Sequence, residues 1–489
     1  MRLSRILLSK TRFEINTINK HVLAAEYAVR GPVLLAASEV ERKMKLNPGS
    51  VPFKRVLKCN IGNPQSLNQK PLSFIRDVLS ITLNPSLKER ARFPADVVAR
   101  AQRYLDEVSS VGAYMESQGI TSVRQEVADF LERRDGYRAD ANNIFLTDGA
   151  SAGVKSILQT IIRDPNTGFR DALMAPIPQY PLYSGSTALY NGTLHPYYLN
   201  EERGWSLTVA DLDDSLRKAH QQGLTPRALV VINPGNPTGQ LLSEDNVRQI
   251  AEWCRNNSIV LMADEVYQEN IWKDGARFTS FRKAAYDLNL FSGENPLQMI
   301  SFHSVSKGFL GECGLRGGYF ELLGISDDVK MQLYKLASMS LASNTIGMIT
   351  VGLMVNPPKP GDESYSLYVS ERDAILSSMK RRARVMTRAL NSMTGVFCNE
   401  IEGAMYAFPT ITLPKKAVDA AKAVGQNADT FYCLRLVEET GICIVPGSGF
   451  GQKDGTWHFR ITILPPEDQI DEATALLKDF HEKFIAKYS

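Results

Sequence analysis

The stretch QMISFHSVSKGFLGECGLR, residues 298–316, decides the fold class of this chain. It begins with five largely apolar residues and continues with serines, glycines and two cationic side chains, Lys307 and Arg316. An apolar run without alternation is typical of a strand that is buried on both faces of a parallel sheet. We therefore predict a buried strand over 298–302, with Lys307 just beyond its carboxyl end.

Four further runs of the same kind lie upstream, and they read IFLT (144–147), ALMA (172–175), ALVVI (228–232) and IVLMA (259–263). Amphipathic stretches separate them, and the clearest helical candidates are 153–163 and 243–256. Short buried strands that alternate with helices predict an α/β domain with a mostly parallel sheet. We assign residues 101–355 to this large domain.

A break rich in proline and glycine, VNPPKPGDES (355–364), follows the large domain. Its two adjacent prolines forbid a continuing helix. Beyond it we predict a smaller C-terminal domain over 356–489, with a long basic helix near 368–393 and an amphipathic helix from Pro466.

The N-terminal end is expected to divide into two parts. Residues 16–100 would form an arm and part of the smaller domain, with a helix near 33–44. Residues 1–15 begin with MRLSRILLSKTR, which carries four cationic side chains before the first acid, Glu14. This pattern fits a short mitochondrial presequence and a basic arm of a cytosolic enzyme equally well. The compartment therefore stays open between the cytoplasm and the mitochondrial matrix.

Composition excludes several classes of function. The chain has 489 residues and a formal net charge of +3, too small a surplus to indicate a nucleic-acid partner. Its six cysteines form no CxxC pair and no Cys/His cluster, so no metal site is expected. No run of about 18 apolar residues occurs, so neither a transmembrane helix nor a membrane partner is expected.

Polar residues gather where the predicted strands end, and ligands of a parallel sheet bind at that edge. After 144–147, Gly149, Ala150 and Ser151 would offer backbone N–H groups at a helix N-terminus, an arrangement that binds phosphate. A plain capped turn between strand and helix explains the same segment, so this signal is weak by itself.

Two more strand ends carry polar groups. NPGNPTG (233–239) holds two Asn-Pro pairs and two glycines, a density that a turn alone rarely needs, and Asn236 could donate to a ligand oxygen. The strand 259–263 ends in ADEVY, so Asp264 and Tyr267 would point into a cleft. A carboxylate there is costly unless a cation pairs with it, although a helix-capping aspartate is the simpler alternative.

Lys307 completes the set beyond the strand 298–302, the fourth of these strand ends. Most lysines are solvated surface charges, but this one follows a buried strand, and Ser304, Ser306 and Arg316 could bind an anion beside it. Nucleotide fingerprints such as GxGxxG and GxxxxGK[ST] are missing from the sequence. A phosphate nest, an oxygen donor, a buried carboxylate and a lysine together fit a phosphorylated aldehyde cofactor.

The motifs NPGNPTG, DEVYQEN and SFHSVSKGFLGECGLRGGY resemble those of the fold-type-I aminotransferases, which use pyridoxal 5′-phosphate (PLP). Longer motifs resemble the alanine aminotransferase branch of that family, and they are EYAVRGP (26–32), NIGNPQ (60–65), YMESQGITSVR (114–124), GAMYAFP (403–409) and VPGSGFG (445–451). The resemblance spans residues 15–485. It implies a seven-stranded, mostly parallel sheet between helices, and a smaller α/β domain formed by both chain ends.

The resemblance also implies a reaction. It is a ping-pong transamination in which L-alanine and 2-oxoglutarate give pyruvate and L-glutamate. Lys307 would hold the cofactor as an internal aldimine and then move the proton of the reaction, with Asp264 and Tyr267 as its catalytic partners. Asp264 would keep the pyridine nitrogen protonated, and Tyr267 and Asn236 would hydrogen-bond the ring oxygen.

The remaining roles follow from the same resemblance. The PLP phosphate would be bound by the backbone near Ala150 and Ser151, by Ser304 and by Arg316, with Ser306 as an additional contact. Substrate binding is assigned to Arg460, which would hold the α-carboxylate, and to Gly62, Asn236 and Tyr180, the last of which would also stack on the cofactor ring. Tyr114 would reach the phosphate of a neighbouring subunit, which implies a homodimer with shared active sites.

Three alternatives remain. The same cofactor could serve an aminotransferase for aromatic amino acids, kynurenine or glyoxylate. A lyase of the same fold is disfavoured by GECGLRGG and GAMYAFP. A non-catalytic relative of the fold is disfavoured because Lys307, Asp264, Tyr267 and Arg460 are all present.

Overall fold

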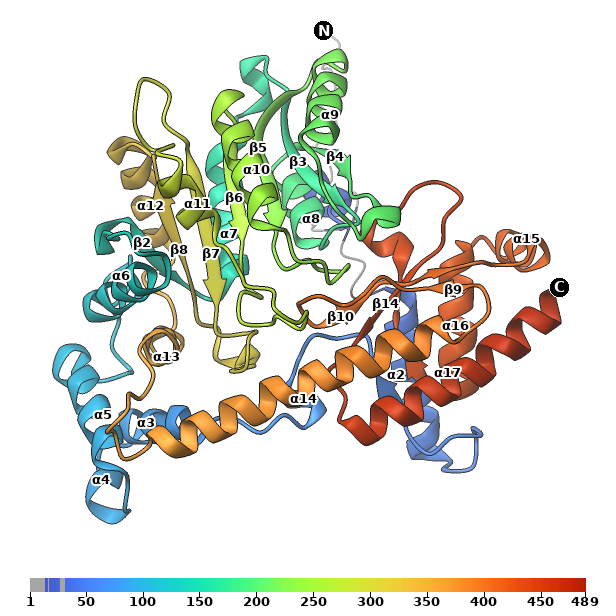
Figure 1. Cartoon of the computed structure of the whole chain (residues 1–489), viewed down its shortest axis with the longest axis horizontal. Coiled ribbons are helices and arrows are strands. Elements are labelled where there is room, and N and C mark those ends of the chain that lie inside the picture. Colours follow the sequence, from blue (N-terminus) through green and yellow to red (C-terminus); the bar gives the residue numbers. More distant parts are fainter. Residues whose placement is uncertain (1–13, 16, 27–30) are drawn as a thin grey trace, which may run out of the picture.

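The structure is a computed structural model, and it describes residues 14, 15, 17–26 and 31–489 (Figure 1). The basic segment 1–12, with its possible presequence, and residues 27–30 of the EYAVRGP motif lie outside the described residues. Over the described part of the chain, no helix combines the length and the apolar composition needed to cross a membrane.

A seven-stranded sheet forms the centre of the large domain, with the strand order β2-β8-β7-β6-β5-β3-β4. The strands are β2 (Ile144–Thr147), β3 (Asp171–Ile177), β4 (Thr193–Tyr198), β5 (Thr225–Ile232), β6 (Val260–Asp264), β7 (Met299–Ser304) and β8 (Gly318–Leu323). In this sheet β8 runs in the opposite direction to the other six strands. The predicted mostly parallel sheet is confirmed, and each of the five predicted strands is present.

Helices cover both faces of the sheet because successive residues of its strands point to opposite sides. In β5, Leu229 and Val231 pack into one core with α9 (Val209–Gln221), α10 (Glu244–Asn256) and α11 (Phe281–Asp287). The alternate residues, Val230 and Ile232, pack into another core with α7 (Ala150–Ile161), α8 (Leu182–Leu189) and α12 (Asp327–Met339). Burial on both faces explains why these strands read as continuous apolar runs.

The smaller domain is built from both ends of the chain, as predicted. Its C-terminal part holds α14 (Tyr365–Asn391), α15 (Lys415–Ala423), α16 (Ala428–Thr440), α17 (Glu467–Tyr488) and the short strands β9 (Val396–Phe397), β10 (Tyr406–Ala407), β11 (Thr410–Ile411), β12 (Ile442–Cys443), β13 (Val445–Pro446) and β14 (Phe459–Thr462). From the N-terminal side, α2 (Pro32–Leu46) packs into the same core and β1 (Leu57–Lys58) pairs with β12.

A helical layer joins the two domains. It consists of α3 (Ser73–Leu83), α5 (Ala95–Val108), α6 (Thr121–Asp135) and α13 (Thr345–Val355), which share one apolar core. The short helices α1 (Lys20–Ala24) and α4 (Leu87–Arg90) complete the described helices. The proline-rich break separates α13 from α14, and Figure 1 shows α14 running from α3 to α17 along the molecule. The exact boundaries at residues 100 and 355 remain predictions.

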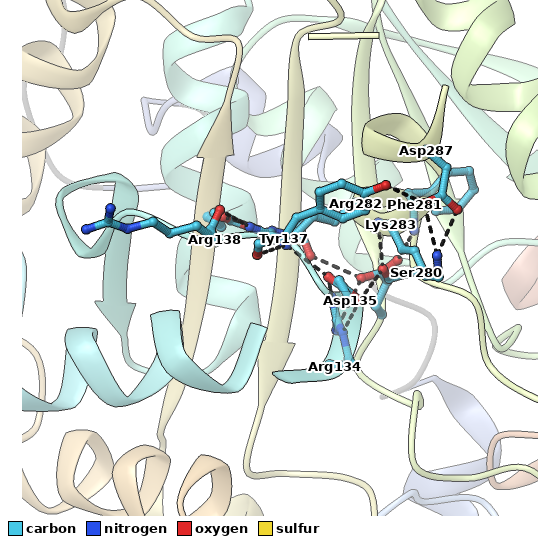
Figure 2. Close-up of polar contacts among 12 residues, drawn as sticks. Arg134, Asp135, Tyr137, Arg138, Ser280, Phe281, Arg282, Lys283 and Asp287 are labelled. Atoms are coloured by element: carbon cyan, nitrogen blue, oxygen red, sulfur yellow. Dashed lines mark hydrogen bonds and ion pairs between the residues drawn. The ribbon is translucent and has the colours of Figure 1, made fainter. Parts of the chain in front are cut away.

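A buried ionic cluster fastens α6 and α11 to the sheet (Figure 2). The side chain of Arg282 is fully buried, and its guanidinium lies 3.0 Å from Glu321 on β8 and 3.3 Å from Asp135 at the end of α6. Ser280, the N-cap of α11, also donates to Asp135 at 2.8 Å. Each buried charge therefore has an opposite charge beside it, as burial requires.

Candidate active site

A cavity of about 450 Å³ opens at the carboxyl ends of β5, β6 and β7, where the large domain faces the smaller one. Its lining includes all the residues that the sequence singled out except Tyr114 and Gly149, and these are Gly62, Ala150, Ser151, Tyr180, Asn236, Asp264, Tyr267, Ser304, Ser306, Lys307, Arg316 and Arg460. Among the other lining residues, which the sequence analysis did not single out, are Asn60, Cys313 and Tyr406.

The fold explains why these side chains meet. Asp264 is the last residue of β6 and Ser304 the last of β7, while Asn236 lies in the loop after β5. Neighbouring parallel strands end at the same edge, so the polar residues that follow them converge. Arg460 comes from β14 of the smaller domain and closes the cavity from the other side.

Asp264 is a buried carboxylate with one strong hydrogen-bond donor. The hydroxyl of Tyr183, on α8, donates to its Oδ2 at 2.6 Å. Burial raises the pKa of Asp264, although the Tyr183 hydrogen bond and the positive charge of Lys307 act against that rise. A cation placed opposite Asp264 would therefore be strongly favoured. Sequence reasoning missed Tyr183, whose only signal was its place beside Tyr180 in PIPQYPLY.

Lys307 connects the two sides of the cavity. Its Nζ donates to the carbonyl oxygen of Gly62 at 2.6 Å. A β-carbon on residue 62 would lie 1.8 Å from the Tyr406 hydroxyl oxygen and 3.0 Å from Lys307 Nζ, so only glycine fits there. Cys313 lies close by, and its thiol donates to the carbonyl oxygen of Ser306 at 3.0 Å.

The far end of the cavity is suited to an anion. Ala150 begins α7, a helix of 12 residues, so free backbone N–H groups point into the cavity. Arg316 crosses this helix end, where its Nη2 donates to Asp148 O at 2.7 Å and to Ser151 Oγ at 3.2 Å. Buried Ser304 lies nearby in the lining. A helix N-terminus, two hydroxyls and a guanidinium form a good phosphate site.

Arg460 is buried in the wall that the smaller domain supplies. Its Nη1 donates to Asn236 Oδ1 at 3.1 Å and its Nη2 to the Asn60 carbonyl oxygen at 2.7 Å. Among the described residues, no carboxylate pairs with this guanidinium, and its buried Nε has no hydrogen-bond partner. An unpaired buried guanidinium suits a ligand carboxylate.

Tyr267 and Tyr406 form a hydrogen-bonded pair inside the cavity. The Tyr267 hydroxyl donates to the Tyr406 hydroxyl at 3.3 Å. Burial raises the pKa of Tyr267 well above its ordinary value. Burial also acts to raise the pKa of Tyr406, but the positive charges of Lys307 and Arg460 and the hydrogen bond from Tyr267 outweigh it, so the pKa of Tyr406 is lowered.

The two remaining predicted tyrosines lie in different places. Tyr180 lines the cavity, and its predicted stacking on a ligand ring stays a prediction. Tyr114 is 78% exposed and is not part of the lining. Its predicted contact with a neighbouring subunit stays a prediction.

Comparisons with known proteins agree with this geometry. The family model "Aminotransferase class I and II" matches residues 76–477. Alanine aminotransferase 2 of Panicum miliaceum is 51% identical over 480 residues, which cover 97% of this chain and 98% of the relative. Glutamate–glyoxylate aminotransferase 1 of Arabidopsis thaliana is 49% identical over 481 residues, which cover 97% of each protein.

A solved structure supports the fold independently. Alanine aminotransferase from Pyrococcus furiosus superposes with a TM-score of 0.74 at 22% identity, covering 95% of this chain and 100% of that one. At this identity the likeness concerns the fold alone, and the predicted fold class is confirmed.

Proposed function

The chain belongs to the class I and II aminotransferases, and from that premise we propose that it transfers an amino group between L-alanine and 2-oxoglutarate, giving pyruvate and L-glutamate. The observation that carries the proposal is the convergence of Lys307, Asp264 and Arg460 on one cavity. A nucleophilic amine, a buried carboxylate and an unpaired guanidinium are the three groups that amino transfer from an amino acid requires.

The residues of the cavity fit PLP, the cofactor of this family. An anion site at the start of α7 and a buried carboxylate line the same cavity as Lys307, and this donor set suits a phosphate, a ring nitrogen and an aldehyde. We propose that the phosphate binds Ala150, Ser151, Ser304 and Arg316. When bound, the cofactor supplies an aldehyde carbon that can carry an amino group and a ring that accepts electrons.

Each side chain then has a defined task. A buried carboxylate without a cation is costly, so Asp264 would favour a protonated ring nitrogen in the bound cofactor. Asn236 accepts from Arg460 through its oxygen, which leaves its amide N–H groups to donate to a ligand. Arg460 binds the α-carboxylate of the amino acid, and the Lys307 amine moves the proton from its α-carbon.

A steady-state assay with alanine and 2-oxoglutarate, with and without added PLP, tests the proposal. Parallel double-reciprocal lines are expected, because one amino group is stored on the enzyme between two half-reactions. Lys307→Ala should lose at least about 10³-fold in kcat and the borohydride-sensitive absorbance of the holoenzyme. Lys483→Ala, which removes an exposed lysine paired with Asp479, is the matched control and should keep both. Full turnover in Lys307→Ala would refute the mechanism.

A second candidate is transfer from glutamate to glyoxylate. It is favoured by the Arabidopsis thaliana relative, which is nearly as similar to this chain as the alanine aminotransferase. An acceptor panel separates the two activities. A kcat/KM for glyoxylate that exceeds those for pyruvate and 2-oxoglutarate would replace alanine transamination as the main reaction.

A homodimer with shared active sites is the proposed assembly. The exposed ring of Tyr114 supports it, because a side chain 78% exposed on its own chain is free to contact a second copy. Sedimentation should give a dimer. Mixing Lys307→Ala with Tyr114→Ala chains should restore part of the activity, since one site of each mixed dimer then carries both native residues. No restoration would argue against sharing.

The compartment is proposed to be the cytoplasm or the mitochondrial matrix. N-terminal sequencing of the native protein separates these two, because removal of a presequence would expose a new N-terminus near residue 12.

A further inference from the structure

Tyr406, the first residue of β10, lies close to several functional groups of the cavity. It is 2% exposed, and its hydroxyl accepts a hydrogen bond from Tyr267 at 3.3 Å. The same hydroxyl and Lys307 Nζ both point at Gly62, within 1.8 Å and 3.0 Å of the place where a β-carbon would be. Tyr406 thus lies on the side of Gly62 that the reacting lysine occupies.

The ring of Tyr406 has a second contact. Arg460 Cζ lies 4.2 Å from its centroid, and 4.7 Å from the centroid of Phe450. This guanidinium is buried, and no described carboxylate neutralises it. Aromatic faces stabilise a desolvated cation through their negative quadrupole and leave its in-plane N–H groups free. The two rings can therefore hold Arg460 ready for a carboxylate without competing for its hydrogen bonds.

The charged groups around the Tyr406 hydroxyl also connect it to the functional groups of the cavity. The titratable groups that face Tyr406 are Lys307, Arg460, Tyr267 and Cys313. Burial acts to raise the pKa of Tyr406, yet the two cations and the Tyr267 hydrogen bond bring it below its ordinary value, whereas the pKa of Tyr267 is raised by burial. In the structure Tyr267 donates and Tyr406 accepts, and this direction stabilises the ionised form of Tyr406.

We propose that Tyr406 is a positioning residue for amino transfer, whose ring holds the carboxylate-binding Arg460 while its hydroxyl orients Tyr267 beside Lys307. The inference rests on the proposed function for the meaning of those three partners. Tyr406 contacts the arginine that binds the substrate carboxylate and also lies beside the reacting amine. One side chain therefore positions both parts of the site.

Two substitutions separate the two roles. Tyr406→Phe removes the hydroxyl and keeps the ring, so kcat should fall about tenfold while KM for alanine changes less than about threefold, the scale of one lost hydrogen bond near a charge. Tyr406→Leu removes the ring as well and should also raise KM about tenfold, the scale of a desolvated cation–π contact. Equal KM values in the two variants would overturn the role of the ring.

A titration of the full-length chain, before and after loading with PLP, tests the hydroxyl without turnover. Ultraviolet difference spectra should reveal one tyrosine that ionises at lower pH than the others, and Tyr406→Phe should lose it. Tyr432→Phe is the matched control, since Tyr432 is equally buried in the smaller domain but contacts His481 outside the cavity. The early-ionising tyrosine should survive in that variant.

These experiments separate a failure of the role proposed for Tyr406 from a failure of the proposed function. If no tyrosine ionises early, or if Tyr406→Phe leaves the titration unchanged, the role of the hydroxyl is refuted whatever the substrate is. If alanine proves a poor donor while the titration behaves as expected, the substrate assignment fails and the positioning role stands.

Discussion

The hydroxyl of Tyr183 donates a 2.6 Å hydrogen bond to Oδ2 of Asp264, and both side chains are buried. This contact joins α8 to the end of β6 and fixes the carboxylate on which the site depends. It also counters the effect of burial, which raises the pKa of Asp264. Tyr183, which the cavity lining does not include, therefore favours the ionised form of Asp264 against the effect of burial.

Tyr183→Phe should raise the pKa of Asp264 further, because a donor to the ionised form is lost. More of the carboxyl is then protonated at a given pH, so the acid limb of the kcat/KM profile should move to higher pH. The plateau should fall about tenfold, the scale of a hydrogen bond to a charged group. Tyr197→Phe is the control, since that buried tyrosine donates to the Val230 carbonyl at 2.7 Å. An acid limb that does not move in Tyr183→Phe would contradict the assigned role.

Much of the fold could be predicted because buried parallel strands are continuous apolar runs, and five were recognised. Two strands of the central sheet were not recognised. β4 lies at the sheet edge, carries Pro196 and alternates in burial, so its composition is weak for a strand. β8 follows the polar loop after Lys307 directly, and its antiparallel course has no sequence signal. Helix α7 begins at Ala150 rather than 153, because Gly149, at φ 76°, turns the chain early.

The residues of the site also divide into those that the sequence could identify and those that it could not. Residues that follow strands, such as Asp264 and Asn236, could be found because strand ends meet at one edge. Asn60, Tyr183 and Tyr406 could not, because each comes from a different element and only tertiary packing brings them together. Tyr406 was visible within GAMYAFP, but the motif does not reveal that its hydroxyl meets that of Tyr267 in the turn after β6.

Gly62→Ala should disrupt the site without affecting the rest of the fold. The added β-carbon would lie 1.8 Å from the Tyr406 hydroxyl oxygen and 3.0 Å from Lys307 Nζ, so one of them must move. A displacement of about 1 Å in a catalytic group costs about 10²-fold in rate. Gly62→Ala/Tyr406→Phe should recover part of the loss, because the closest oxygen is gone. Gly49→Ala, with only a contact at 3.9 Å, is the control.

The stability of the chain should depend on pH through Glu265, which lies next to Asp264 but points into the cluster of Arg134 and Ser301. Burial raises its pKa from 4.5 to about 7, despite the opposing charge of Arg134. The folded state therefore binds this proton more tightly than the unfolded state. Its contribution is present below pH 4.5 and is lost as the pH rises to about 7.

Urea unfolding at several pH values checks this sign. Relative to the native chain, Glu265→Gln should flatten the fall in unfolding free energy over that window, by up to about 3 kcal/mol. Glu438→Gln alters an exposed carboxylate that pairs with Arg435, and it should leave the profile unchanged. A native profile that rises with pH and is not altered by Glu265→Gln would show that Glu265 is ionised throughout.

Arg282→Met should destabilise the fold by about 3–5 kcal/mol, because it leaves buried charges without their partner. Arg282 is fully buried between Glu321 and Asp135, and it also donates to the Tyr137 and Arg138 carbonyl oxygens at 3.1 Å and 2.8 Å (Figure 2). Equilibrium urea unfolding measures the loss.

The double variant decides whether charge or shape causes that loss. Arg282→Met/Glu321→Leu removes both members of the closest pair, while Asp135 keeps Arg134 at 2.8 Å. If the uncompensated charge is the cause, the double variant should be more stable than Arg282→Met alone, since replacing a buried pair by apolar residues is often neutral. If packing around Arg282 is the cause, the second substitution should add to the loss. Lys483→Met, in an exposed pair, should change stability by less than about 0.5 kcal/mol and sets the scale for a surface charge.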